Sequence, residues 1–208
     1  RLSAALAIFL AATVSTFAGA VVVSVTDQDG APAKDVVVTL SVESAPANSV
    51  NAAPKIIDQT NEQFDALVTV VGVGGGVAFT NSDLTRHHVY SFSAIKQFEF
   101  VLDPGQKSNP VVFGTAGIAA IGCNIHDRMV AYVFVADTPY AAVSGADGRV
   151  SFADLPDGTY AVALWHPSQK GQGVPPQKLT VNGGSAAAAL TIPLVPVWER
   201  AMPHPREY

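Results

Sequence analysis

The chain has 208 residues, of which 12 are Lys or Arg and 17 are Asp or Glu, so its formal net charge is −5 at pH 7. This acidic balance argues against the basic surface that nucleic-acid binding requires, and we expect no nucleic-acid partner. The sequence contains one cysteine, Cys123. It cannot form an intramolecular disulfide, so its thiol is a free group, an intermolecular bridge or a metal ligand.

Residues 1–20 have the pattern of a secretory signal peptide. One charge, Arg1, precedes an apolar run at residues 6–17, and Ala18-Gly19-Ala20 offers the small residues of a cleavage site. The alternative for this segment is a buried N-terminal helix. No later segment has the ~18 apolar residues that a membrane-spanning helix needs. We therefore predict export to the periplasm and a soluble mature protein without a membrane span.

After residue 20, short runs of Val, Ile, Phe and Tyr alternate with turn residues, and no long segment has helical periodicity. This pattern is typical of an antiparallel β-sandwich. Residues 44–54 are small and polar and predict a loop. We expect strands near residues 21–26, 36–43, 55–60, 67–71, 76–80, 87–93, 98–102, 110–114, 117–122 and 130–136.

A second block of strands begins after residue 136. Residues 146–149 (Ala-Asp-Gly-Arg) predict a hairpin turn, after which Val150 and Phe152 alternate with Arg149 and Ser151 as in a strand. Asp154-Leu-Pro-Asp-Gly158 predicts another turn before a strand at 159–165. Two more strands are expected at 177–182 and 187–193, joined by a turn at 183–185. The predicted organisation is a signal peptide (1–20), a first domain (21–136), a small β module (137–196) and a tail (197–208).

Three potential metal ligands lie in one short loop. Cys123, His126 and Met129 have C-x2-H-x2-M spacing. A thiolate, an imidazole and a weak thioether suit a copper ion that cycles between Cu(I) and Cu(II), and such a site needs a second imidazole. His87 and His88 are the upstream candidates. Adjacent strand residues point to opposite faces, so only one of them can reach the metal. Because His88 shares its face with the apparent core residues Tyr90 and Phe92, alternation alone favours His88.

The same residues resemble the cupredoxin family. The resemblance covers residues 21–136 and rests on segments 64–74 and 76–83, on His87, and on the loop from Cys123 to Met129, whose spacing is similar to that of amicyanins. The spacing from Asn81 and Asp83 favours His87 over His88. Chains of this combined layout look like those labelled methylamine-utilisation proteins. Ala66 and Arg86 depart from the proline and the proline or glycine that the family often has at these positions.

The resemblance implies an all-β fold, with a Greek-key cupredoxin sandwich followed by a small transthyretin-like β-sandwich. The second block resembles the carboxypeptidase regulatory-like module, which implies a structural or docking role. For the first domain, the resemblance implies one type 1 copper bound by His87, Cys123, His126 and Met129, single-electron transfer, and a redox partner such as a dehydrogenase or cytochrome. His126 would be the route for the electron, and the protein would not be an enzyme.

Other functions remain open at this stage. The same ligands serve a protein that buffers or delivers copper without electron transfer, and the second block alone would permit a metal-free carbohydrate-binding or adhesion protein. Asp127 beside His126 suggests a Cys-His-Asp nucleophile, although no substrate-pocket pattern accompanies it. Zinc would favour a carboxylate or a second cysteine over a thioether. His166 and His204 are interpreted as a turn residue and a tail residue. Arg86 and Arg128 predict a positive rim around the metal site.

Overall fold

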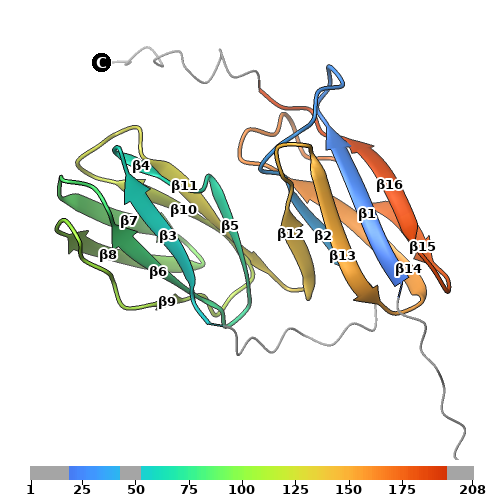
Figure 1. Ribbon diagram of the computed structural model, residues 1–208, viewed down its shortest axis with the longest axis horizontal. Helices are drawn as coiled ribbons and strands as arrows, with labels where there is room; N and C mark the ends of the chain where they lie inside the picture. Colours follow the sequence, from blue (N-terminus) through green and yellow to red (C-terminus); the bar gives the residue numbers. More distant parts are fainter. Residues whose placement is uncertain (1–18, 43–52, 196–208) are drawn as a thin grey trace, which may run out of the picture.

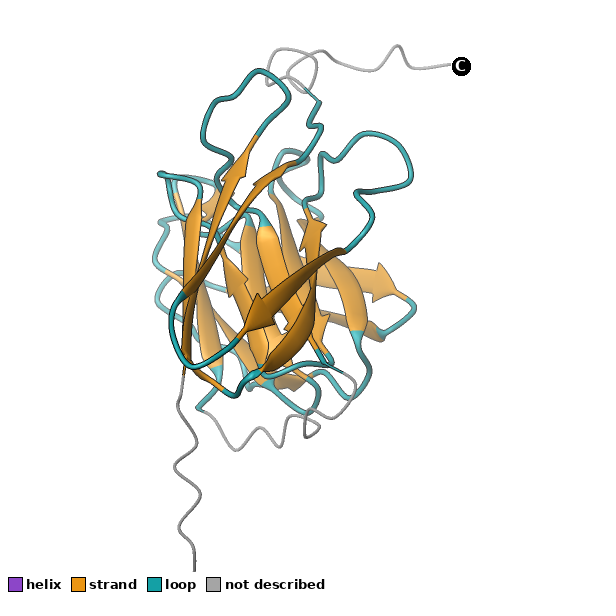
Figure 2. Ribbon diagram, turned by 90° about the vertical axis from the view of Figure 1, so that its right-hand side faces the viewer, coloured by secondary structure: helices purple, strands orange, loops and turns teal. Residues whose placement is uncertain are grey.

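The computed structural model describes residues 19–42 and 53–195, and all regular secondary structure in these residues is β. The predicted all-β fold is therefore confirmed. Figure 1 shows two groups of strands side by side, and Figure 2 shows strands joined by loops with no helix in the described residues. None of the described residues forms a helix that could span a membrane. The predicted signal peptide lies outside the described residues except for Gly19 and Ala20, which begin β1.

The first sandwich consists of two sheets, with strand orders β4-β3-β6-β9 and β5-β11-β10-β7-β8. The chain crosses between these sheets after β4, β5, β6, β8 and β9, as in a Greek-key sandwich. The predicted strands of this region are present, and the two-residue strand β4 is an addition. The strands are β3 (Lys55–Thr60), β4 (Gln63–Phe64), β5 (Val68–Gly72), β6 (Gly76–Asn81), β7 (His87–Ser93), β8 (Lys96–Leu102), β9 (Val111–Val112), β10 (Gly117–Cys123) and β11 (Val130–Ala136).

Alternation of apolar residues builds the core of the first sandwich. In β11, Ala131, Val133 and Val135 are buried, while the residues between them face outward, as the period of two in a strand requires. The buried residues of both sheets form one cluster that includes Phe79, Phe113 and the two sulfur-containing residues Cys123 and Met129. The ligand loop predicted from the sequence therefore starts and ends in the core.

The second sandwich combines the beginning of the chain with its end. Its sheets have strand orders β13-β1-β16 and β12-β2-β14-β15. Its core contains buried side chains from both parts, among them Val23, Leu40, Tyr160 and Ile192. The strands are β1 (Gly19–Thr26), β2 (Val37–Ser41), β12 (Tyr140–Val143), β13 (Arg149–Leu155), β14 (Gly158–Trp165), β15 (Gln177–Val181) and β16 (Ala186–Thr191).

This pairing differs from the predicted arrangement of the chain. Residues 21–43 were expected in the first domain, but β1 pairs in parallel with β16 from Val21↔Ala186 to Thr26↔Thr191, and β2 pairs with β12 and β14. The first sandwich is thus inserted between β2 and β12. The predicted turns at 146–149 and 183–185 do not close hairpins, because the strands on either side of each belong to different sheets. Local patterns predict strands but not partners so distant in sequence.

An aromatic contact joins the two sandwiches. The ring of Trp165, at the end of β14, lies 5.8 Å from the ring of Tyr132 and 5.5 Å from that of Phe134. Both partners lie on the outward face of β11, the strand that follows the ligand loop. Trp165 therefore covers part of the outer face of the sheet that carries the candidate site.

Leu40→Ala tests the membership of β2 in the second sandwich. Leu40 is fully buried and pairs with Val162 of β14, so we expect the free energy of unfolding to fall by ~2–5 kcal/mol, the cost of a large-to-small core change. Denaturant unfolding measures this loss, and Leu84→Ala, at an exposed position, should change stability by less than ~0.5 kcal/mol. Amide exchange in Leu40→Ala should increase mainly in β14 and β15; an increase confined to β10 and β11 would contradict the assignment.

Candidate metal site

Three segments bring the potential ligands together at one end of the first sandwich. His87 is the first residue of β7, Cys123 is the last residue of β10, and His126 lies in the loop between β10 and β11. Cys123 pairs with Val89 across the antiparallel strands, and the amide of Asn124 donates to the carbonyl of His88 at 3.0 Å. The turn is closed by the Met129 amide, which donates to the carbonyl of His126 at 3.0 Å. Backbone pairing therefore fixes where the loop begins and ends.

The three side chains form the one group of potential ligands found among the described residues, counting His, Cys, Asp and Glu. Cys123 Sγ lies 3.7 Å from His87 Nδ1 and 3.7 Å from His126 Nδ1, and the two Nδ1 atoms are 3.2 Å apart. Metal–nitrogen bonds are ~2.0–2.1 Å and metal–thiolate bonds ~2.3 Å. Because each donor separation is shorter than the sum of two such bonds, a single ion can reach all three donors. The residues fit a metal.

The three donors differ in their exposure to solvent. His87 is 0% exposed and Cys123 4% exposed, whereas His126 is partly exposed. The rings of His87 and His126 meet nearly edge to face, with centroids 4.9 Å apart. An ion held here would therefore be reached from solvent at the His126 side.

The structure brings His87, not His88, to the cysteine. His88 points to the other face of the strand, with Nε2 3.7 Å from a carboxylate oxygen of Glu99. Strand alternation favours His88 only if Tyr90 and Phe92 belong to the core, but Phe92 is 71% exposed. The face of β7 that carries Val89 is the buried one, so the choice made from family spacing agrees with this geometry.

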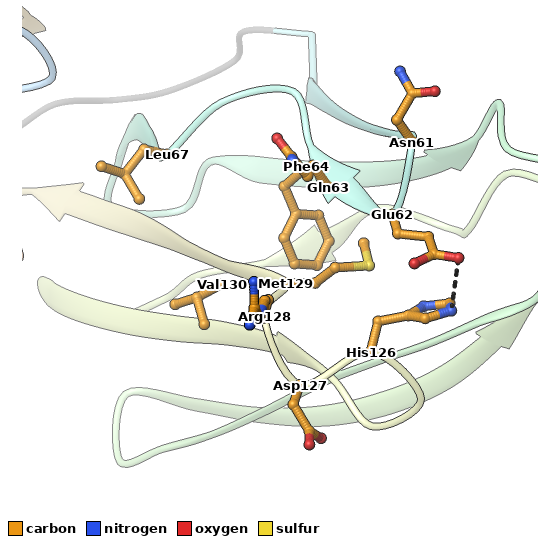
Figure 3. A pocket seen from close by; sticks show the side chains of 10 residues that line it. All are labelled: Asn61, Glu62, Gln63, Phe64, Leu67, His126, Asp127, Arg128, Met129 and Val130. Atoms are coloured by element: carbon orange, nitrogen blue, oxygen red, sulfur yellow. Dashed lines mark ion pairs between the residues drawn. The ribbon is translucent and has the colours of Figure 1, made fainter. Parts of the chain in front are cut away.

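Met129 is fully buried and lines a pocket of about 580 Å³ together with His126. In Figure 3 its sulfur points toward the side of the pocket where the His126 ring lies, next to the ring of Phe64. The thioether is thus placed in the core beside the ligand loop. As a neutral, weakly donating group it suits a secondary ligand rather than a main one.

A carboxylate that the sequence analysis did not assign orients His87. Asp83 Oδ2 lies 3.0 Å from His87 Nε2. If this ring nitrogen carries the proton, it donates to Asp83 and leaves Nδ1 unprotonated toward Cys123. This is the usual arrangement of a metal-binding histidine. The pKa of Asp83 is lowered, chiefly by the hydrogen bond from the backbone N–H of Glu62, with smaller contributions from His87 and the Asn61 amide. Asp83 is therefore held as an anion.

The loop that carries Asp83 is anchored by a buried amide side chain. Asn81 donates through Nδ2 to the carbonyls of Thr85 and Leu102, at 2.8 and 2.9 Å, and accepts the Asp83 N–H at 2.9 Å. These bonds satisfy the amide in the interior, as buried polar groups require. Asn81 thus positions Asp83, and Asp83 positions His87.

The remaining sequence-predicted residues lie outside the donor group. Asp127 is exposed, and its carboxylate points away from the His126 ring in Figure 3. Arg86 forms an ion pair with Asp103 at 2.6 Å, so one of the two cations of the expected rim is paired. His166 lies in the second sandwich, where its Nδ1 accepts the Ser168 N–H at 3.0 Å. His204 lies outside the described residues.

Two carboxylates near the site, Asp83 and Glu62, were not predicted as site residues, because no local sequence pattern links them to the histidines. Asp83 precedes His87 by four positions in a loop, where no periodicity links their side chains. Glu62, which faces His126 with Glu62 Oε1 3.6 Å from His126 Nε2, is distant in sequence from the ligand loop. Only the pairing of the strands brings these carboxylates to the imidazoles.

Comparison with known proteins gives matches to solved structures alone: no protein-family model and no curated protein matches the sequence. A purple cupredoxin from Nitrosopumilus maritimus is 23% identical over 39% of this chain and 99% of its own, with a TM-score of 0.36. A variant of amicyanin in its reduced Cu(I) form is 21% identical over 48% of this chain and 98% of its own, with a TM-score of 0.38.

A copper-containing nitrite reductase from Thermus scotoductus is 21% identical over 44% of this chain, with a TM-score of 0.38, and only 25% of the reductase is covered. The chain therefore spans a quarter of the reductase's length. All three matches involve less than half of this chain. The interpretation of the site rests on its own donor geometry.

Proposed function

We propose that the chain is a type 1 copper protein that carries single electrons between redox partners. The observation that supports this most directly is the convergence of one thiol and two imidazole Nδ1 atoms within 3.7 Å of one another, with Met129 buried beside them. His87, Cys123 and His126 would hold one copper, and Met129 would be the axial ligand. Copper in such a site alternates between Cu(I) and Cu(II) at a potential that the axial ligand tunes.

The residues around the donors hold the ligand side chains in place, which favours electron transfer because the site need not rearrange when copper changes oxidation state. His87 is fixed by Asp83, and Cys123 and Met129 are enclosed by core side chains. Side chains held by packing and hydrogen bonds keep their positions when the charge of the site changes. The proposal includes export to the periplasm, which rests on the pattern of residues 1–20, and a dehydrogenase or cytochrome as redox partner.

A catalytic cysteine is the competing interpretation of the same geometry. Cys123, His87 and Asp83 are arranged in the order thiol, imidazole and carboxylate, as in cysteine nucleophiles. However, the thiol is buried, and the pocket at this end of the sandwich is lined by His126 and Met129 and not by Cys123. A substrate carbonyl therefore has no described route to Sγ, and the electron carrier is the better proposal.

The absorption spectrum of the oxidised, copper-loaded protein tests the function. A thiolate bound to Cu(II) gives intense visible colour, and we expect one equivalent of copper per chain to produce it. Repeated reduction and reoxidation should bleach and restore the colour without loss of metal. A colourless complex would rule out the type 1 site, and colour that is lost with the copper on the first reduction would favour copper delivery.

Met129→Leu should change the potential of the site more than its affinity for copper. Leucine has a similar volume and keeps the core filled, so the fold should lose less than ~1.5 kcal/mol. Loss of a weak axial donor should raise the reduction potential, measured by voltammetry on the copper-loaded variant. Complete loss of copper binding in Met129→Leu would show that the thioether is a main ligand and that the proposed coordination is wrong.

A further inference from the structure

The turn between β3 and β4 extends to the exposed side of the candidate metal site. Its two central residues, Asn61 and Glu62, have φ values of 54° and 55°, in the left-handed region. Residues other than glycine occupy this region at a cost of ~1–3 kcal/mol each unless their surroundings hold them there. Positive φ at both central residues is the type I′ conformation that two-residue hairpins favour, and neither residue here is the glycine that would adopt it without cost.

Asp83 is the group that holds the turn. Its Oδ1 accepts the Asn61 N–H at 3.0 Å and its Oδ2 accepts the Glu62 N–H at 2.7 Å, and the same Oδ2 faces His87 Nε2 at 3.0 Å. Hydrogen bonds to a charged acceptor are about twice as strong as neutral ones. One carboxylate thus fixes both the orientation of His87 and the turn that carries Glu62.

The turn presents the Glu62 carboxylate to the second imidazole. Glu62 Oε1 lies 3.6 Å from His126 Nε2, and Figure 3 shows the two side chains facing each other among the residues that line the pocket. This distance is that of an ion pair rather than a hydrogen bond. Since His126 Nδ1 faces Cys123, the carboxylate lies beside Nε2, the nitrogen that carries the proton when Nδ1 binds a metal. Each of the two imidazoles therefore has Nδ1 toward the thiol and Nε2 toward a carboxylate.

Glu62 also sets the balance of charge at the pocket. The charged residues that line it are two carboxylates, Glu62 and Asp127, and one guanidinium, Arg128. Arg86, the other cation expected near the site, is paired with Asp103. The expected positive rim is therefore replaced by a pocket with one excess negative charge, and the Glu62 carboxylate lies next to the partly exposed imidazole of His126.

We propose that Glu62 is a positioning residue for His126 and makes the mouth of the metal site select a redox partner that presents lysine or arginine side chains. The selection of a cationic redox partner rests on the proposed copper function, whereas the positioning of His126 does not. The carboxylate orients the ring before metal binding and stays beside the exposed ring edge. A cationic patch on the partner would be attracted to it, and an acidic patch would be repelled.

The affinity for zinc tests whether Glu62 positions His126. Zn²⁺ does not change oxidation state, so this test does not depend on the proposed electron transfer. Glu62→Gln keeps the side-chain size and removes the charge, and because the Glu62 side chain is 56% exposed, the fold should be unaffected. Because this pair is an ion pair without a hydrogen bond, its effect should be smaller than that of a hydrogen-bonded outer partner, and we expect ~2–5-fold weaker zinc binding by competition with a chelator. Glu99→Gln is the matched control, because Glu99 forms a similar pair, at 3.7 Å, with His88 outside the donor group. It should bind zinc like the parent protein.

The rates of oxidation of the reduced, copper-loaded protein by small complexes test the charge selection. One electron passes from the protein to tris(phenanthroline)cobalt(III), a cation, or to hexacyanoferrate(III), an anion, and reduces the metal of the complex. At 0.01 M ionic strength, where the Debye length is ~30 Å, Glu62→Gln should lower the ratio of cation to anion rates by ~3–10-fold. Glu99→Gln should change it by less than ~2-fold.

The outcomes separate the two proposals. Equal effects of Glu62→Gln and Glu99→Gln on zinc affinity and on the rate ratio would overturn the role of Glu62 while leaving a coloured, reversible copper site intact. A colourless copper complex would overturn the proposed function, and the zinc comparison would still decide whether Glu62 positions His126. Weaker zinc binding together with a smaller rate ratio, both confined to Glu62→Gln, would support the inference.

Discussion

Replacing Cys123 with serine is expected to abolish the intense colour of the copper-loaded protein. Thiolate is the ligand form of cysteine, and its negative charge and soft sulfur give it a strong bond to copper. A serine hydroxyl stays protonated near pH 7 and cannot replace that donor. His87 and His126 would remain 3.2 Å apart as a pair of nitrogen donors, so copper binding should weaken rather than disappear. The measurement compares the visible absorption of the variant and of the parent protein at the same amount of bound copper.

The effect on folding has to be separated from the effect on the metal. Cys123 is buried among core residues such as Ile121, and a hydroxyl placed there without a partner costs ~1–3 kcal/mol. Cys123→Ala avoids the buried hydroxyl and should also be colourless. Circular dichroism of both variants would show whether the β structure is retained. Colour that persists in either variant at full copper occupancy would mean that Cys123 is not a ligand.

The positions of the strands could be predicted because their cause is local. In β7 and β11 the alternation of buried and exposed residues follows directly from the pleat, and turn residues mark the ends. The two short strands β4 and β12 were not predicted as strands. β4 has only two residues, Gln63 and Phe64, and its strand conformation depends on pairing with β3. A segment this short carries no period of its own.

The partners of the strands could not be predicted from local patterns. Thr26 and Thr191 end the paired segments of β1 and β16 although 165 positions separate them. The valines of β1 would suit a strand in many sheets, and its position is fixed by pairing with β13 on one side and with the alanine-rich strand β16 on the other. The resemblance to cupredoxins made it natural to count β1 and β2 in the first domain. Their burial against Tyr160 and Leu164 shows otherwise.

The site was predictable to the extent that its residues are contiguous. Cys123, His126 and Met129 share a loop, so their spacing is visible in the sequence, whereas the carboxylates of Asp83 and Glu62 reach the imidazoles from separate turns. The face of β7 was misjudged from its aromatic residues. Tyr90 packs over Gly122, where an added Cβ would lie 2.7 Å from the tyrosine ring, and Phe92 stands beside Tyr90 on the surface. Aromatic residues that alternate along a strand therefore do not by themselves show that their face is buried.

His87→Ala and His88→Ala should have opposite consequences, which makes them the sharpest test of the upstream ligand. His87→Ala removes a nitrogen donor that faces Cys123 at 3.7 Å and leaves Asp83 without its imidazole partner. Loss of an outer partner alone lowers metal affinity by ~10–100-fold, so loss of the ligand itself should exceed ~100-fold. Copper affinity from competition with a chelator measures this, and the intense colour should vanish with it.

His88→Ala provides the matched control, because it removes the adjacent imidazole from the same strand. The His88 ring contacts Glu99 on the outer face, and such exposed ion pairs contribute ~0–1 kcal/mol. Its copper affinity and spectrum should therefore match those of the parent protein within ~2-fold. The backbone carbonyl of His88, which accepts the Asn124 amide at 3.0 Å, is retained in the alanine variant, so the ligand loop keeps its anchor. If His88→Ala lost the colour while His87→Ala kept it, His88 would be the upstream ligand, and the proposed donor group would be wrong.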